Sequence, residues 1–190
     1  LAAAWGKCPE GKRLVAVGRL EAVKGFDLLL QAFSRIADRF PDWTLVIWGE
    51  GRERAGLEGL RDRLGLAPRV ELPGVTQTPG MWIETADVFV LSSHYEGWPN
   101  ALMEAMAAGI PVVSYDCPWG PGEMIEHGKN GALVRPDDVP ALADALTTVL
   151  GDPDMRRRYG EAARARAARF EPDKIMSKWD SLIHAACRQS

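Results

Sequence analysis

Two glutamates eight positions apart, Glu96 and Glu104, are the side chains in this sequence best placed to act together. On one continuous helix they would lie about two turns apart, roughly 12 Å at 1.5 Å per residue. Glu96, however, follows an apolar run in a predicted loop, and Glu104 falls just inside the next helix-forming stretch, so both can face one crevice. Each could then bind one end of an extended ligand. The alternative is that Glu96 is solvated and Glu104 only interacts favourably with the helix dipole.

The segment around these glutamates has the pattern of a strand, a loop, a helix and a second strand. The apolar runs VFVL at 88–91 and IPVV at 110–113 are rich in β-branched residues, which favours parallel strands covered on both faces. Residues 100–108 between them are helix formers; Pro99 fits the first helical turn, and Asn100 is an alternative cap. The loop then lies at the carboxyl end of a strand, where open α/β sheets bind ligands. The amino end of the helix predicts an anion site there.

Two cations precede this segment by a long stretch of chain but are predicted to lie on the same edge of the sheet. Arg19 and Lys24 follow the carboxyl end of the first predicted strand, at 13–17. Two positive charges beside a helix amino terminus suit a diphosphate. Either cation taken alone would be expected to be solvated. The prediction therefore depends on both cations and the helix amino terminus lying at the same edge of the sheet.

Apolar runs and helical periodicities alternate about six times along the chain. This alternation predicts an α/β fold, a Rossmann-like, doubly wound parallel sheet of about six strands with helices at the carboxyl end. The expected strands are 13–17, 44–48, 70–72, 88–91, 110–113 and 132–134. The expected helices are 26–40, one ending near 64, 100–108, 123–127, one capped by Asp137 and ending near 150, 154–169 and 172–187; residues 81–85 form a short segment to which no element type is assigned.

Composition excludes several classes of protein. With 190 residues and 46% hydrophobic content, we expect one well-packed domain. The formal net charge of −3 gives no general attraction to nucleic acid or to an anionic membrane. No run of eighteen apolar residues is present, so no membrane-spanning helix is expected. Cys8, Cys117 and Cys187 are distant and odd in number, which favours reduced thiols in a cytoplasmic protein and argues against a zinc site.

Familiar nucleotide and metal motifs do not fit. The glycines at 49, 51 and 56 miss the dinucleotide-binding spacing, and the GKN at 128–130 is no P-loop. Asp152 and Asp154 form a DxD pair, which we interpret as a helix cap, not a metal site. The histidines have no partner at metal-ligand spacing. The arginine-rich stretch 156–169 is interpreted as the solvated face of a helix and not as a nucleic-acid surface.

At these residues the sequence resembles a known family. The resemblance covers about residues 13–186 and points to the carboxyl-terminal, nucleotide-sugar-binding domain of the glycosyltransferase family 4 (group 1) enzymes, which have the GT-B fold. Glu96 and Glu104 match the family's E-x7-E element. The stretches that carry the resemblance are GRLEAVKGFDLLL, LVIWGEG, RVELPGV, ADVFVLSSHYEGWPNALMEAMAAGIPVVS and GKNGALV.

The resemblance implies a role for each residue of the site. Arg19 and Lys24 would bind the donor's diphosphate and stabilise the leaving group, Glu96 would contact the sugar, and Glu104 would accept hydrogen bonds from the ribose. Together with Arg19 and Lys24, Glu96 would form the catalytic set. The other donor-binding residues would be Gly18, Gly49, Gly74 and Val75, the last two beside the base, and Gly97, Trp98, Pro99, Asn100, Ala101 and Leu102, whose backbone would hold sugar and phosphate.

The resemblance also implies an incomplete enzyme. Residues 1–12 would be a linker from a missing amino-terminal acceptor domain, 13–170 the donor-binding domain, and 171–190 a helix crossing back to the missing domain. We expect a retaining, metal-independent hexosyltransferase without a cofactor, using a UDP-sugar and a glycan or lipid acceptor. The fragment alone would be inactive, and the full-length protein cytoplasmic or at the inner membrane face. Alternatives are a non-catalytic nucleotide- or phosphosugar-binding module, or a phosphorylase or epimerase with the GT-B fold.

Overall fold

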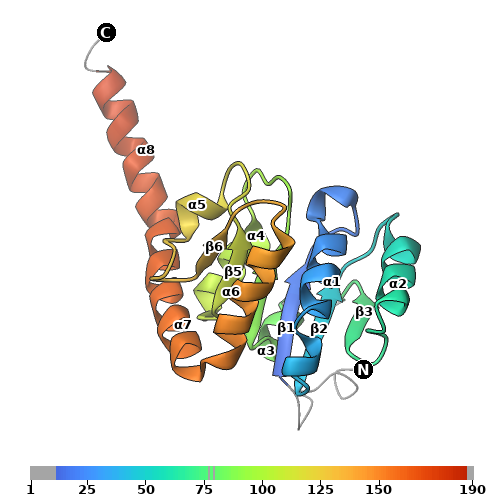
Figure 1. Cartoon of the computed structure of the whole chain (residues 1–190). Coiled ribbons are helices and arrows are strands. Elements are labelled where there is room, and N and C mark those ends of the chain that lie inside the picture. The colour runs from blue at the N-terminus through green and yellow to red at the C-terminus, as the bar shows by residue number, and fades with distance from the viewer. Residues whose placement is uncertain (1–11, 77, 79, 188–190) are drawn as a thin grey trace.

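The computed structural model describes residues 12–76, 78 and 80–187, and its centre is a sheet of six strands (Figure 1). All neighbouring strands are parallel. Their order across the sheet is β3-β2-β1-β4-β5-β6. This confirms the predicted fold class. The strands are β1 (Lys12–Val17), β2 (Trp43–Trp48), β3 (Val70–Gly74), β4 (Val88–Leu91), β5 (Val112–Tyr115) and β6 (Ala132–Val134).

Both faces of the sheet are buried, because successive strand residues point to opposite sides. Leu14 and Ala16 belong to one apolar cluster and Val15 to another. The first cluster includes side chains of α1 (Phe26–Ser34), α2 (Arg54–Arg63) and α6 (Val139–Gly151). The second includes those of α3 (Met81–Thr85), α4 (Asn100–Ala108), α5 (Pro121–Met124) and α7 (Pro153–Ala167). The fold is therefore doubly wound.

The strand order reverses between β1 and β4, which are sequence-distant neighbours in the middle of the sheet. At such a point the loops that follow the two strands turn to opposite faces and leave a crevice between them. The loop after β1 contains Arg19 and Lys24, and the loop after β4 contains Glu96. The topology thus brings together the three side chains that the sequence predicted to share one edge.

The helix predicted over 26–40 is shorter than expected. α1 ends at Ser34, and the chain continues through a 3-10 turn, η3 (Ala37–Arg39). The guanidinium of Arg69 donates hydrogen bonds to the carbonyls of Ala37, Phe40 and Trp43. Ala37 and Phe40 lie in or directly after this turn and Trp43 begins β2, so the arginine ties the irregular segment between α1 and β2 to the residue before β3. Apolar periodicity continues through 40, but it does not show where the helical hydrogen bonds end.

Two further helix starts differ from the sequence prediction. Asp138, not Asp137, caps α6, its carboxylate accepting from the backbone N–H of Ala141 at 2.9 Å. Asp137 has φ +61° instead. The helix predicted over 123–127 is the shorter α5, and it begins at Pro121. The interpretation of the DxD pair is confirmed at Asp152, which caps α7 by accepting from Met155 at 2.8 Å.

The arginines of α7 are not simply a solvated face. Arg156 donates to the last carbonyls of α6, Val149 and Leu150, at 2.9 and 2.7 Å. Arg164 donates in the same way to the end of α4, and Arg166 donates to the carbonyl of Glu123 at 2.7 Å. Cations at helix carboxyl ends neutralise exposed carbonyl dipoles. These arginines therefore join α7 to its neighbours.

The last helix, α8 (Pro172–Cys187), extends away from the sheet (Figure 1). Its exposed apolar side chains are Met176, Trp179, Leu182 and Ile183. It follows a 3-10 turn, η4 (Ala168–Phe170), close to the predicted boundary at 170. Of the predicted linker 1–12, residues 1–11 lie outside the described residues. No described helix has the combination of length and apolar content needed to cross a membrane.

A close contact between backbones sets how α7 packs on α4. A Cβ built on Gly160 of α7 would lie 2.2 Å from the carbonyl oxygen of Gly109 at the end of α4. We therefore expect Gly160→Ala to lower the free energy of unfolding by about 1–3 kcal/mol through overpacking. The matched control is Gly56→Ala in α2, where the nearest atom is a side-chain oxygen at 3.9 Å. That change should stabilise the helix by up to ~1 kcal/mol. Urea unfolding of both variants measures the difference; equal effects would contradict this account.

Candidate functional site

Lys24 and Glu96, expected to bind different parts of a ligand, form an ion pair with each other. Lys24 Nζ lies 2.6 Å from Glu96 Oε1. The same oxygen accepts a hydrogen bond from Ser93 Oγ, also at 2.6 Å. Glu96 is only 8% exposed, so its charge needs such partners to remain in the interior. Glu96 Oε2 forms no hydrogen bond to any described residue and is left available to a ligand.

The backbone of two loops holds this ion pair in place. Lys24 ends the 3-10 turn η2 (Ala22–Lys24), and its carbonyl accepts from Ser92 Oγ at 2.9 Å. The N–H of His94 donates to the carbonyl of Val23 at 2.9 Å. Gly25 follows at φ +57°, and a Cβ there would lie 2.2 Å from the carbonyl oxygen of Ser92. The loops after β1 and β4 are therefore joined through the backbone, with the charged side chains fixed above them.

The close packing around Gly18 and Gly49 is also possible only because these residues have no side chain. Gly49 has φ +144°, and a Cβ on it would lie 1.8 Å from the carbonyl oxygen of Gly18. A Cβ on Gly18 would lie 3.3 Å from the Lys24 side chain, whose stem passes over this glycine. Gly18 thus lies beside the Lys24 side chain, and Gly49 lets the loops after β1 and β2 approach each other.

Arg19 and Glu104 are the charged groups left open to solvent at this edge. Both side chains are exposed, and neither has a hydrogen-bond or ion-pair partner within the described part of the chain. Glu104 lies on α4, whose amino end has no side-chain cap. The N–H groups of the first turn, which begins at Asn100, are therefore not occupied by a protein side chain. An unpaired cation and an uncapped helix terminus favour a bound anion.

The loop before α4 is open at Gly97 and packed at Trp98. A Cβ on Gly97 would meet no atom within 4 Å, so the backbone there can be approached closely. The Trp98 ring is 43% exposed and packs edge-on against Phe170, with the ring centroids 5.4 Å apart. Pro99 is buried, Ala101 and Leu102 continue into α4, and Leu102 is fully buried. Because its side chain is buried, Leu102 can contact a ligand only through its backbone.

Gly74 and Val75 lie at the far side of the same edge, beside an arginine that the sequence analysis did not select. Arg54 contacts both carboxylate oxygens of Glu50, at 2.8 and 2.5 Å, and donates to the carbonyl of Gly49 at 3.3 Å. A Cβ on Gly74 would lie 3.1 Å from Glu50. Val75 is 68% exposed. The Arg54 guanidinium holds the pKa of the Glu50 carboxyl below its usual value.

A third loop, following β5, covers the Glu96 loop. The N–H of Glu96 donates to the carbonyl of Pro118 at 3.4 Å, and a Cβ on Gly120 would lie 2.5 Å from Pro99 Cδ. Cys117 is buried in this loop. Burial, with a further contribution from the negative charge of Glu96, raises the pKa of the Cys117 thiol to about 11. At neutral pH this thiol is protonated.

Sequence reasoning missed Ser93, Arg54 and Cys117 as neighbours of the site. Arg54 lies four residues after Glu50, but Glu50 precedes α2, so helical spacing gave no reason to pair them. Ser93 and Cys117 gave no signal either, because their positions depend on how two loops fold. Within the described ranges, no three His, Cys, Asp or Glu side chains gather as a metal site would require.

The fold and the placement of these loops define a class: a Rossmann-like domain of the type that forms the carboxyl-terminal half of GT-B enzymes. Residues 2–166 match the model of the family described as "Glycosyl transferases group 1". The chain belongs to this family, as the sequence resemblance indicated.

The chain aligns with only part of each curated relative. An exopolysaccharide phosphotransferase of Streptomyces coelicolor is 39% identical over 174 residues, which cover 91% of this chain but 18% of that protein. Across eight curated relatives, the chain spans between 18% and 49% of the relative's length. Names of whole relatives therefore describe more than the part that aligns.

Two solved structures are similar over most of the chain. A mutant of S. aureus TarM, crystallised with Fondaparinux, alpha-GlcNAc-glycerol and UDP, has a TM-score of 0.85 and 26% identity, covering 94% of this chain and 36% of that one. The carboxyl-terminal domain of a group 1 glycosyl transferase from Francisella tularensis has a TM-score of 0.76 and 26% identity, covering 83% of this chain and 85% of that one. Both comparisons support the predicted fold class.

The stability of the fold should depend on Lys24 more than on Arg19. Lys24→Met leaves the buried Glu96 with only Ser93 as partner, so we expect a loss of roughly 1–3 kcal/mol in the free energy of unfolding. Arg19→Met removes an exposed, unpaired charge and should change it by less than about 0.5 kcal/mol. Denaturant unfolding at pH 7 compares the two. In Lys24→Met/Glu96→Gln most of the loss should disappear, and additive effects would contradict a direct pair.

The reactivity of Cys117 reports the charge of its neighbours. Glu96→Gln should lower the pKa of the Cys117 thiol and speed its alkylation by iodoacetamide at pH 8, whereas Lys24→Met should raise the pKa and slow it. We expect changes on the order of twofold to fivefold. Mass spectrometry of the labelled peptides measures the rates, with the exposed Cys187 as internal control. Loosening of the loops would speed both variants, so only changes of opposite sign fit this arrangement.

Proposed function

We propose that this chain is the donor-binding domain of a retaining glycosyltransferase that takes its sugar from a nucleotide-diphospho-sugar. The observation on which this depends is the grouping, at the switch point of the sheet, of the unpaired Arg19 and the uncapped amino end of α4. Both favour negative oxygen, and they belong to loops that follow neighbouring strands. Membership of the group 1 family supports the reaction class.

In this proposal each residue acts through its own charge or hydrogen-bonding group. Arg19, the first turn of α4 and Lys24 stabilise the diphosphate, and they do so most strongly as negative charge develops on the departing nucleotide. Glu104 accepts hydrogen bonds from the ribose, and the free Oε2 of Glu96 accepts them from sugar hydroxyls. Gly74 and Val75 flank the base. No metal or cofactor is needed, because protein cations and helix N–H groups take the role of a divalent ion.

UDP is the nucleotide that we propose, and a glycan or a lipid-linked sugar is the acceptor. The TarM structure of similar fold was crystallised with UDP, which supports the first choice. The acceptor would be bound mainly by an amino-terminal domain outside this chain, docked on the exposed apolar face of α8. We further propose that the whole protein is cytoplasmic, that it lies at the inner membrane face if the acceptor is a lipid, and that this chain alone transfers little sugar.

Calorimetric titration with nucleotides tests this function. UDP should bind the isolated chain, and Arg19→Ala should weaken binding about tenfold, a loss of about 1.4 kcal/mol. Lys24→Ala should weaken it less, because in the free protein Lys24 already has a partner in Glu96 that it must give up. EDTA should change nothing. The control is Arg158→Ala on α7, another exposed arginine without a partner within the described residues.

Three results would contradict the proposal. UDP, GDP and ADP could all fail to bind at millimolar concentration, Arg19→Ala could bind like the parent, or Arg158→Ala could weaken binding as much as Arg19→Ala. The relative affinities for the three nucleotides decide the base. The anomeric outcome needs the full-length enzyme, where an NMR spectrum of the first product should show a retained configuration.

A further inference from the structure

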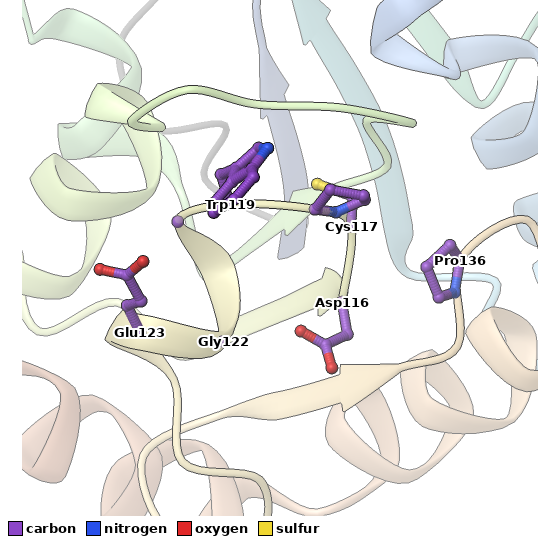
Figure 2. Close-up of a pocket in the computed structure, with 8 residues that line it drawn as sticks. Asp116, Cys117, Trp119, Gly122, Glu123 and Pro136 are labelled. Carbon is purple, nitrogen blue, oxygen red and sulfur yellow. The ribbon is translucent and has the colours of Figure 1, made fainter.

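The loop after β5 forms a pocket beside the Glu96 loop, and its lining includes none of the donor-binding residues proposed above. Its volume is about 380 Å³, within the range of roughly 300–1,000 Å³ of small-molecule sites. Asp116, Cys117, Trp119, Gly122, Glu123 and Pro136 are among the lining residues (Figure 2). Gly120 packs against Pro99, and the N–H of Glu96 donates to the carbonyl of Pro118. Since Glu96 is the residue proposed to contact the donor sugar, the pocket adjoins the position of that sugar.

The chemistry of the lining selects one class of ligand. Trp119 is 66% exposed and presents a flat indole at the rim, while Cys117 and two prolines give an apolar interior. The carboxylates of Asp116 and Glu123 have no hydrogen-bond or ion-pair partner within the described part of the chain. None of the described residues that line the pocket is a lysine, arginine or histidine, so its two carboxylates would repel an anionic ligand such as a phosphate. An aromatic face, acceptor oxygens and a lining without cations together suit a neutral ligand ring that carries many hydroxyl groups.

The backbone of this loop holds the indole in an unusual position. Trp119 has φ +66°, a conformation that costs a side-chain-bearing residue on the order of 1–3 kcal/mol and a glycine almost nothing. Gly122 leaves room for Asp116, since a Cβ on it would lie 2.8 Å from Asp116 Oδ1. The strain at Trp119 also provides a variant, Trp119→Gly, that removes the indole while relaxing the backbone.

We propose that this pocket binds a neutral pyranose ring next to the donor site, with Trp119 stacking on its C–H face and Asp116 and Glu123 accepting its hydroxyl hydrogens. The ring belongs to the acceptor or to the transferred sugar, an assignment that rests on the proposed function. The same lining disfavours a metal ion, because Asp116, Cys117 and Glu123 form no three-ligand group within the ranges that the structure describes.

NMR of the 15N-labelled chain, at 20.8 kDa, tests the proposal through the Trp119 indole N–H signal and, for Trp119→Gly, through the backbone amide signals of residues 116–123. The probes are methyl α-glucoside, methyl α-galactoside and N-acetylglucosamine at up to 50 mM, with inorganic phosphate as the anionic comparison. We expect saturable shifts of the Trp119 signal with at least one sugar and none with phosphate. Trp119→Gly should abolish sugar binding while keeping a melting temperature equal to or above the parent's. Trp179→Ala on α8 is the matched control for loss of an exposed indole.

The role of the carboxylates is tested in the same way. Asp116→Asn should weaken sugar binding severalfold, and Asp144→Asn, an exposed aspartate of α6, should leave it unchanged. No saturable shift with any of the three sugars, a shift that persists in Trp119→Gly, or a shift caused by phosphate would each overturn the proposal.

Two further titrations separate the sources of the ring. If the ring belongs to the acceptor, free sugar still shifts Trp119 when UDP-glucose is saturating; if it belongs to the donor, UDP-glucose itself moves the signal and displaces the free sugar. Either result supports the pocket. UDP binding is measured on the same sample, so that loss of nucleotide binding counts against the proposed function and loss of sugar shifts counts against the pocket alone.

Discussion

Close approach between backbones at the carboxyl edge of the sheet is the constraint on which the rest of the site depends. At Gly25 and Gly49 the loop after β1 and a neighbouring loop lie so close that a side chain on either glycine would collide with a backbone carbonyl. At these two glycines a carbonyl oxygen of the neighbouring loop packs directly on the backbone, which leaves the loops little freedom to move. Lys24 and Glu96 come from loops joined in this way, so their ion pair is positioned before any ligand arrives.

The charges at this edge fall into two groups with different duties. Lys24 and Glu96 neutralise each other in a buried position, where an unpaired charge would be costly. Arg19 and Glu104 remain exposed and free to bind. A ligand that carries both phosphate and hydroxyls could separate the buried pair without leaving either charge uncompensated. Its phosphate would become the partner of Lys24, and its hydroxyls would become the partners of Glu96. A ligand with phosphate alone would leave Glu96 with Ser93 only.

The sequence was sufficient for the sheet, because most of its strands are short apolar runs rich in β-branched residues and are separated by helix-forming stretches. All six strands were found; β3 extends through Pro73 to Gly74, which an edge strand tolerates, and β5 lies two residues later than the expected 110–113. The edge of the sheet that bears Arg19, Lys24 and Glu96 followed from topology alone. What could not be foreseen were contacts made by distant side chains: the hydrogen bonds of Arg69 to the segment after α1, that of Ser93 to Glu96, and the pairing of Lys24 with Glu96. Such contacts depend on loop conformation, for which periodicity gives no signal.

The contact of Trp98 with Phe170 has a mechanical consequence. Phe170 closes η4, and α8 leaves the body two residues later with its apolar face uncovered. A helix of 16 residues is about 24 Å long, so a 10° change of direction at its root displaces its tip by about 4 Å. A partner that bound the apolar face of α8 would displace the far end of the helix more than its root. A shift of the root that moved Phe170 would change the packing of Trp98 in the loop before α4.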